Sequence, residues 1–230
     1  MTKSIETDIL IIGAGPVGLF TVFEAGLLGL KCHLVDNLDK IGGQCIELYP
    51  EKPIYDIPGV PNQTGKEHID SLLKQIEPFD YEVHLNQRVD KIEESGDYWI
   101  AETTDGISFK TLNIFIAAGA GSFEPRKPPV ESPDKFLGKG IDYAVRSVDK
   151  YKDKDIVIFG GGDSALDWSV ELANKAKSIK LVHRRDDFRG AEHTENKMRN
   201  FVASGEIELK IPFVIKSIAV SYTHLRAHET

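Results

Sequence analysis

The chain has 230 residues, with 28 Lys and Arg against 36 Asp and Glu, so its formal net charge is −8. Apolar residues make up 41% of the chain and charged residues 28%, which is typical of a globular protein long enough for one large or two modest cores. The acidic balance argues against a nucleic-acid binder and against a polybasic membrane-surface protein, because both carry clustered basic charge.

Two further features narrow the class of protein. No signal-peptide pattern is visible at the start, and no apolar run approaches the length of a membrane span. The two cysteines, Cys32 and Cys45, form no CxxC pair and cannot build a disulfide framework. We therefore expect a cytoplasmic protein with no membrane and no nucleic-acid partner.

The first elements follow the order strand, glycine turn, helix, strand. An apolar run over 8–12 leads into a turn, and a helix-like stretch and a second apolar run over 32–35 follow before Asp36. In such a unit the glycines permit a tight turn, close approach of a pyrophosphate and close helix packing, and the acid accepts hydrogen bonds from ribose hydroxyls. The turn is Gly13-Ala14-Gly15-Pro16-Val17-Gly18.

The middle of the chain predicts one helix and a small antiparallel insertion. Helical spacing covers 65–77, and proline density over 125–133 marks the expected linker. Strands are expected over 83–85, around 89–92, 98–101 and 107–109, and separately over 112–118.

The second half repeats the first unit. An apolar run over 155–159 is followed by Gly160-Gly161-Gly162-Asp163-Ser164-Ala165, a helix-like stretch and a strand-like run over 179–182. Asp155 stands as far from Asp8 as Gly160 stands from Gly13 and His183 from Asp36. A constant offset over four elements favours two dinucleotide sites over two unrelated glycine-rich turns.

The two units differ at the end of their second strand. Where the first unit has Asp36, whose carboxylate would repel a 2′-phosphate, the second has His183-Arg184-Arg185, with Arg189 nearby. A planar guanidinium suits a phosphate dianion, so we expect the second unit to prefer NADP over NAD. The simpler alternative is a solvated, charged strand end, because Asp186 and Asp187 reduce the local charge.

These motifs together closely resemble the thioredoxin-reductase-like type of ferredoxin–NADP reductase, in the pyridine nucleotide-disulfide oxidoreductase superfamily. The resemblance covers residues 8 to about 219 and is carried by the two glycine turns and by the segments 41–44, 48–59, 117–127, 160–168 and 183–189. It implies an α/β flavoprotein and homodimer with two Rossmann-like, three-layer ββα domains, in which an NADPH domain interrupts the FAD domain. Residues 1–122 would be the N-terminal segment of the FAD domain, and 123–219 an incomplete NADPH domain.

The resemblance also implies which residues bind the cofactors. For FAD these are Gly13, Gly15, Pro16, Gly18, Asp36, Gly43, Gln44, Tyr49, Val89 and Phe123, with the backbone of Val89 at the adenine. For NADP they are Gly160, Gly162, Asp163, Ser164, His183, Arg184, Arg185 and Arg189. Without the resemblance, Tyr49 and Phe123 would be interpreted as ordinary core aromatics.

The implied activity is electron transfer between NADPH and ferredoxin or flavodoxin through FAD, by hydride transfer followed by one-electron steps. The cofactors carry this chemistry, so we nominate no side-chain catalyst and no metal ligand. Thioredoxin reductase itself needs a CxxC pair in its NADPH domain, and residues 123–219 contain no cysteine. The alternatives are an NADPH-dependent flavoprotein that reduces another carrier or a quinone, and a non-catalytic nucleotide-binding fragment that lacks the C-terminal FAD segment.

The last residues, 220–230, depart from the family pattern. Their sequence, VSYTHLRAHET, resembles one translated frame of an adaptor used in sequencing libraries. We therefore expect a non-native tail on a truncated chain, the alternative being a genuine polar C-terminus. His224 and His228 alone do not complete a metal site.

Overall fold

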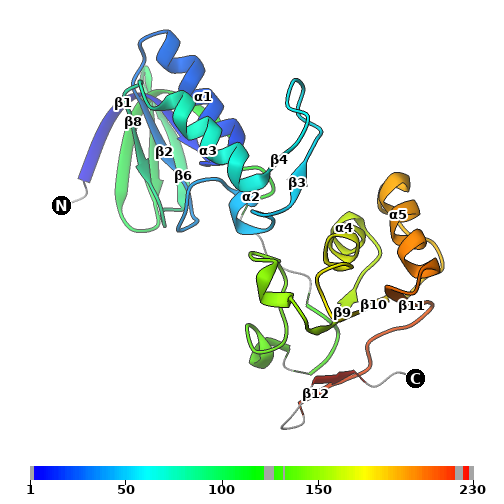
Figure 1. The fold of residues 1–230 in the computed structure, drawn as a ribbon. Helices are drawn as coiled ribbons and strands as arrows, with labels where there is room; N and C mark the ends of the chain where they lie inside the picture. The colour runs from blue at the N-terminus through cyan, green and yellow to red at the C-terminus, as the bar shows by residue number, and fades with distance from the viewer. Residues whose placement is uncertain (1–2, 122–126, 132, 221–224, 228–230) are drawn as a thin grey trace. The chain divides into compact units, whose positions relative to one another are not determined.

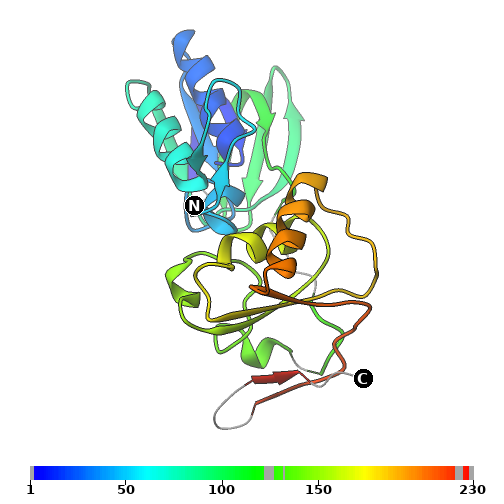
Figure 2. The same cartoon turned by 45° about the vertical axis from the view of Figure 1, so that its right-hand side comes forward.

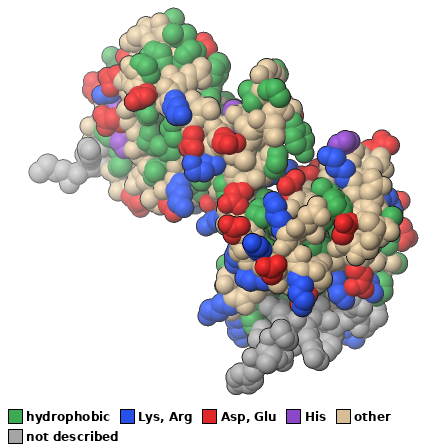
Figure 3. Space-filling view, in the orientation of Figure 1, with side chains coloured by type: hydrophobic (Ala, Val, Ile, Leu, Met, Phe, Trp, Pro, Cys, Tyr) green, Lys and Arg blue, Asp and Glu red, His purple; other side chains and the backbone are tan. Residues whose placement is uncertain are grey.

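The computed structural model describes residues 3–121, 127–131, 133–220 and 225–227. The chain forms two compact units, Met1–Glu124 and Pro125–Thr230, and the boundary falls at the start of the proline-dense stretch (Figure 1). None of the helices in the described ranges has the length and apolar character needed to cross a membrane. On the face seen in Figure 3, acidic and basic side chains are interspersed over each unit.

A six-stranded sheet with the order β5-β2-β1-β8-β7-β6 organises the first unit. Its first four strands are parallel: β5 (Tyr81–His84), β2 (Cys32–Val35), β1 (Lys3–Ile12) and β8 (Ile107–Ile116). The antiparallel strands β7 (Tyr98–Thr103) and β6 (Val89–Ser95) follow as the predicted insertion.

Strand β8 corrects one prediction. The sequence predicted two strands, over 107–109 and 112–118, but the structure has one continuous strand over Ile107–Ile116. The reason is β1, which is ten residues long and pairs with β8 from Lys3↔Ile107 to Ile12↔Ile116. A partner of that length keeps β8 extended beyond the point where its own pairing with β7 ends, at Trp99↔Thr111.

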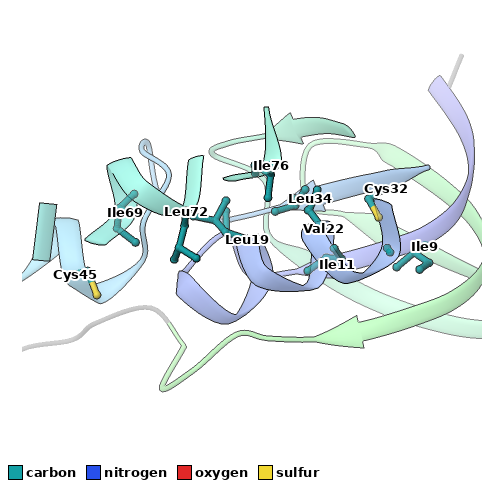
Figure 4. Close-up of a cluster of buried hydrophobic side chains, with 12 residues drawn as sticks. Ile9, Ile11, Leu19, Val22, Cys32, Leu34, Cys45, Ile69, Leu72 and Ile76 are labelled. Carbon is teal, nitrogen blue, oxygen red and sulfur yellow. The ribbon is translucent and has the colours of Figure 1, made fainter. Parts of the chain in front are cut away.

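Helices α1 (Pro16–Leu27) and α3 (Gly65–Ile76) lie on one side of the parallel part of this sheet (Figure 2). Side chains of β7 and β8 pack against its other side. Because strand side chains alternate, β1 contributes Ile9 and Ile11 to the helix side and Leu10 to the opposite side. The helix-side core joins the two strands and the two helices through Leu19, Val22, Cys32, Leu34, Ile69, Leu72 and Ile76 (Figure 4). On the opposite side, Leu10, Val35, Ala101 and Phe109 form a smaller buried cluster.

Between β2 and α3 the chain makes the short helix α2 (Gln44–Glu47) and the small hairpin of β3 (Pro53–Ile54) and β4 (Gln63–Thr64). The chain thereby places residues 41–44 next to the first glycine turn, where Gly42 N–H donates to the carbonyl of Ala14 at 2.9 Å.

The second unit repeats the parallel strand–helix–strand arrangement. Its sheet has the order β11-β10-β9, made of β9 (Asp155–Phe159), β10 (Ser178–Val182) and β11 (Ile207–Lys210). Helix α4 (Asp163–Leu172) connects β9 to β10, and α5 (Glu192–Ala203) connects β10 to β11. Leu166, Leu172, Ile179, Leu181, Met198 and Ile207 form its buried core.

Shorter elements flank this sheet. The 3₁₀ turns Pro133–Phe136 and Asp149–Tyr151 precede β9. After β11, β12 (Ile218–Val220) pairs antiparallel with β13 (Leu225–Ala227).

Candidate functional site

The first glycine turn joins β1 to α1, and two of its glycines are required by the packing of the chain itself. Gly13 has φ +111°, and a Cβ there would lie 2.4 Å from the carbonyl oxygen of Ala117. A Cβ on Gly18 would lie 1.9 Å from the carbonyl oxygen of Gly13. Any side chain at either position would therefore push α1 or β8 away from the turn.

Gly15 is different, because no residue in the described part of the chain requires a glycine there. Its φ of −79° and ψ of −174° suit any residue, and a Cβ would meet only the Cα of Gly43, at 3.8 Å. Gly15 caps α1, where no side chain bonds the cap and Pro16 follows at the start of the helix. The space over Gly15 and the adjoining helix N-terminus fits a pyrophosphate that approaches the backbone closely.

The segment that contains Gly43 and Gln44 closes against this turn. Gly43 has φ +55°, and a Cβ on it would lie 3.0 Å from the Cα of Gly15. Gln44 begins α2 immediately afterwards, half-buried. The structure therefore brings Gly13, Gly15, Pro16, Gly18, Gly43 and Gln44 into one neighbourhood.

Asp36 lies at the end of β2 with its carboxylate turned to the same place. Its Oδ2 accepts a hydrogen bond from Ala14 N at 2.7 Å, and its Oδ1 accepts one from Leu38 N at 2.9 Å. These two bonds fix the half-buried carboxylate beside the glycine turn, and each oxygen keeps a further lone pair for a ribose hydroxyl. The sequence could not identify Ala14 and Leu38 as the backbone donors, because a backbone N–H leaves no mark on residue type.

The other three residues expected at FAD, Val89, Tyr49 and Phe123, differ in how closely the structure connects them to the glycine turn. Gln87 N donates to the carbonyl of Asp36 at 2.9 Å, so the chain passes Asp36 just before Val89 begins β6. Tyr49 packs against the helix-side core and lies 3.8 Å from Cys45 Sγ through its hydroxyl, and burial raises the pKa of Tyr49 to about 12. Its contacts are those of a core aromatic. Phe123 lies outside the described residues.

The second glycine turn joins β9 to α4 and repeats the geometry of the first. Gly160 has φ +148°, and a Cβ there would lie 2.9 Å from the Cβ of Ala165, the counterpart of Gly18. Gly162 caps α4 with no side-chain hydrogen bond, and a Cβ on it would meet no described residue within 4 Å. Gly162 therefore leaves the same kind of space as Gly15, beside the exposed Ser164 in the first turn of α4.

The loop after β10 folds back over this second turn and is tied to it by two hydrogen bonds. Arg189 N donates to the carbonyl of Gly161 at 2.7 Å, and Ala191 N donates to Asp163 Oδ1 at 2.8 Å. The His183 ring covers Gly161, where a Cβ would lie 2.4 Å from the ring, and stacks on Phe188 at 5.3 Å between centroids. His183 and Asp163 thus hold the loop in place.

Arg184, Arg185 and Arg189 are exposed on the loop that these contacts hold. Within the described ranges, none of the three guanidinium groups makes an ion pair or a side-chain hydrogen bond. They are therefore available for an anion near the N-terminus of α4. Sequence reasoning included Gly161 and Phe188 only within longer motifs and did not reveal their contacts with this loop. It missed Gly190, although a glycine at that position was a visible signal: a Cβ there would lie 2.5 Å from Leu166 Cδ1.

Comparison with known proteins agrees with this architecture. The family model for pyridine nucleotide-disulphide oxidoreductases matches residues 7–224. A ferredoxin–NADP reductase of Bradyrhizobium sp. is 56% identical over 212 residues, which are 92% of this chain and 62% of the relative. One of Beijerinckia indica is 51% identical over 219 residues, 94% of this chain and 64% of the relative.

The structural neighbours have the same fold. The thioredoxin reductase of Lactococcus lactis, solved in its FR conformation, matches this chain with a TM-score of 0.79 and 26% identity. The match covers 95% of this chain and 69% of the thioredoxin reductase chain. The chain spans 62% of the length of the Bradyrhizobium relative. The predicted α/β fold with Rossmann-type units is confirmed, and the chain belongs to the pyridine nucleotide-disulphide oxidoreductase family.

Proposed function

We propose that this chain is part of an NADPH-dependent ferredoxin reductase, in which the first unit binds FAD and the second binds NADPH. One observation carries the proposal: two turns of the same geometry end in opposite chemistry, the fixed carboxylate of Asp36 in one and the unpaired Arg184 and Arg185 in the other. The relatives named ferredoxin–NADP reductase support the same assignment.

In the first unit, backbone N–H groups would bind the pyrophosphate of the dinucleotide, and a carboxylate would bind its ribose. The N-terminus of α1 and the open face of Gly15 would hold the pyrophosphate. The carboxylate of Asp36, already oriented by Ala14 N, would accept the ribose hydroxyls. Of the described residues, we propose Gln44 and Tyr49 near the flavin, Gly43 as a further FAD contact and the Val89 backbone at the adenine.

In the second unit, the negatively charged phosphates of the cofactor would bind to a helix N-terminus and to arginine side chains. Gly162 and the N-terminus of α4 would take the pyrophosphate, and Arg184, Arg185 and Arg189 would take the 2′-phosphate. The Asp163 carboxylate holds the loop through Ala191 N, which keeps these arginines near the turn.

When bound, a flavin supplies the conversion between a hydride from a nicotinamide and single electrons for a carrier such as ferredoxin or flavodoxin. Neither cysteine of this chain is suited to relay those electrons. Cys32 and Cys45 are both buried free thiols in the first unit. Burial raises the pKa of the Cys32 thiol to about 11 and also raises that of Cys45, which disfavours the reactive thiolate.

We propose a homodimer in the cytoplasm as the working form.

The test of function compares electron donors and acceptors on the purified, FAD-loaded protein. We expect reduction of ferredoxin with NADPH, little with NADH, and none of thioredoxin. Faster reduction of a quinone than of ferredoxin would point to the quinone-reductase alternative. Failure to bind any flavin would favour a non-catalytic fragment.

The test of cofactor choice uses the double substitution of Arg184 and Arg185 to Ser. We expect the affinity for NADPH to fall at least tenfold, which corresponds to about 1.4 kcal/mol, while that for NADH stays unchanged. Equal affinities of the wild-type protein for NADPH and NADH would contradict the role given to these arginines. Lys197→Ser on α5 is the matched control, because it removes an exposed positive charge outside the loop.

A further inference from the structure

Three potential metal ligands lie together at the β5 edge of the first unit's sheet. His33 on β2 pairs in register with Glu82 on β5, and His84 follows Glu82 two residues later. Their neighbours Leu34 and Val83 pack on the helix side. Because strand side chains alternate, the three ligands face the opposite side, and this cluster is separate from the dinucleotide contacts described above.

The two imidazoles form a packed pair. Their rings stack at 5.2 Å between centroids with 14° between planes, and Phe109 closes on His84 edge-on at 5.1 Å. His33 Nδ1 lies 2.9 Å from His84 Nε2, which is a hydrogen bond. His33 is 1% exposed and His84 is half-buried, so the pair lies at the edge of the interior.

Within the part of the chain that the structure describes, the other nitrogen of His33 has no hydrogen-bond partner. Its Nε2 is buried with no hydrogen bond and lies 3.9 Å from Glu82 Oε1, beyond hydrogen-bond distance. If His33 donates from Nδ1, then Nε2 presents a lone pair toward a carboxylate. If it accepts at Nδ1, then Nε2 holds a buried N–H without an acceptor. Both tautomers leave an uncompensated polar atom, and a cation between Nε2 and Oε1 would resolve the first arrangement.

We propose that His33, Glu82 and His84 bind a divalent transition-metal ion of the zinc class. One nitrogen of each ring and one carboxylate oxygen already lie within 4.8 Å of one another. Zinc takes imidazole and carboxylate ligands at about 2.0–2.2 Å in tetrahedral geometry, so its ligands lie roughly 3.3 Å apart.

Small side-chain movements complete such a site. The Glu82 side chain is 56% exposed and can move inward, whereas His84 is half-buried and would turn its ring toward the ion. Lys31 Nζ, 3.4 Å from Glu82 Oε1, would have to swing into solvent, which its exposed position permits. Solvent at Glu82 would supply the fourth ligand. The ion would tie β5 to β2 at His33, three residues before Asp36, whose N–H donates to the carbonyl of His84 at 2.9 Å.

The experiment titrates metal-free protein with Zn²⁺ alone and, separately, with Co²⁺ as a spectroscopic probe. We expect saturable binding of one ion per chain, a rise in the Tm of the first unit, and the visible absorption bands of tetrahedral Co²⁺. Glu82→Gln, an exposed substitution that leaves the core intact, and His84→Gln should each weaken binding at least tenfold. His68→Gln on α3, and a variant in which His224 and His228 are both Gln, serve as controls and should bind as the wild type does.

Absence of saturable Zn²⁺ binding to the wild type would overturn the proposal. So would undiminished binding by folded Glu82→Gln and His84→Gln proteins, or loss of binding only when the C-terminal histidines are replaced. Far-ultraviolet circular dichroism of each variant separates loss of a ligand from loss of the fold.

Discussion

At the residue scale, the same residue type serves two purposes in one turn. Gly13 and Gly18 are glycines because neighbouring backbone lies 2.4 and 1.9 Å from where their Cβ atoms would be. Gly15 and Gly162 have ordinary backbone angles; among the described residues, a Cβ would meet only the Cα of Gly43, at 3.8 Å, on Gly15 and nothing within 4 Å on Gly162. The first pair is explained by the fold, whereas no described residue requires the second pair, which suits a ligand that comes close to the backbone.

Alanine substitutions separate these purposes. Gly18→Ala should destabilise the first unit by about 1–3 kcal/mol through overpacking, even though alanine normally favours a helix. Gly15→Ala should cost less than about 1 kcal/mol as a helix cap but weaken FAD binding at least tenfold. Urea denaturation measures the first effect and flavin titration the second. Wild-type FAD affinity in Gly15→Ala would remove Gly15 from the proposed site.

At the element scale, helix α3 begins differently from helices α1 and α4. Helix α3 starts with a capping box: Thr64 Oγ1 accepts from Glu67 N at 3.2 Å, and Glu67 Oε2 accepts from Thr64 N at 2.7 Å. Helices α1 and α4 start with Gly15 and Gly162, which offer no side chain to their first N–H groups. A self-capped helix start is structural, and an uncapped one beside open space is where an anion would be stabilised.

The capping box of α3 predicts a pH dependence. The Thr64 N–H bond holds the pKa of Glu67 below its ordinary value of 4.5. A carboxyl whose folded pKa is lowered stabilises the protein above its unfolded pKa and loses that effect as the pH falls through the folded pKa. We expect wild type to be more stable than Glu67→Gln at pH 7, with the difference shrinking below pH 4.5.

Urea denaturation from pH 7 to pH 3 measures this difference. Glu77→Gln, just after the end of α3, is the control and should not destabilise the protein, because removing an acid there suits the helix dipole. Thr64→Ala should cost about 1 kcal/mol at pH 7. A pH-independent difference between wild type and Glu67→Gln would show that the ionised carboxylate is not what stabilises the cap.

The loop after β10, which carries Arg184, Arg185 and Arg189, allows a prediction about Asp163. If its carboxylate acts by holding Ala191 N, Asp163→Asn should keep near-wild-type NADP⁺ affinity, since the amide oxygen can accept the same bond. Asp163→Ala should lose several-fold, because the loop that carries Arg184 and Arg185 would be released. Calorimetric titration with NADP⁺ distinguishes the two. Tighter binding by both variants would instead mean that Asp163 mainly repels the phosphates.

How far the sequence predicts these elements depends on whether their causes are local. The strand, turn and helix of each unit follow from apolar spacing and glycines within a short window, and both units form as predicted. The continuity of β8 depends on β1, nearly a hundred residues away along the chain, and was mispredicted. The bond from Arg189 N to Gly161 O and the His33–His84 pair are likewise contacts between distant segments, which residue spacing does not reveal.

At the scale of the whole molecule, the two copies of the repeated strand–turn–helix–strand sequence lie in two compact units. Each unit has its own parallel strands and its own buried core. Each unit also carries its own glycine turn, and the groups that we assign to a ribose or a phosphate belong to the same unit as that turn. The binding free energy of each dinucleotide should therefore stabilise one unit without requiring the other.

Hydrogen exchange read by mass spectrometry tests this separation. A ligand at 100 times its Kd stabilises the state that binds it by about 2.7 kcal/mol, which slows exchange through global unfolding of that unit roughly 100-fold. We expect FAD to protect peptides from β1, α1 and β2, and NADP⁺ to protect those from β9, α4 and β10. Asp36→Ala should abolish the first effect only, and Arg184→Ser with Arg185→Ser the second only. Protection of both units by either ligand alone would mean that the two sites are thermodynamically coupled.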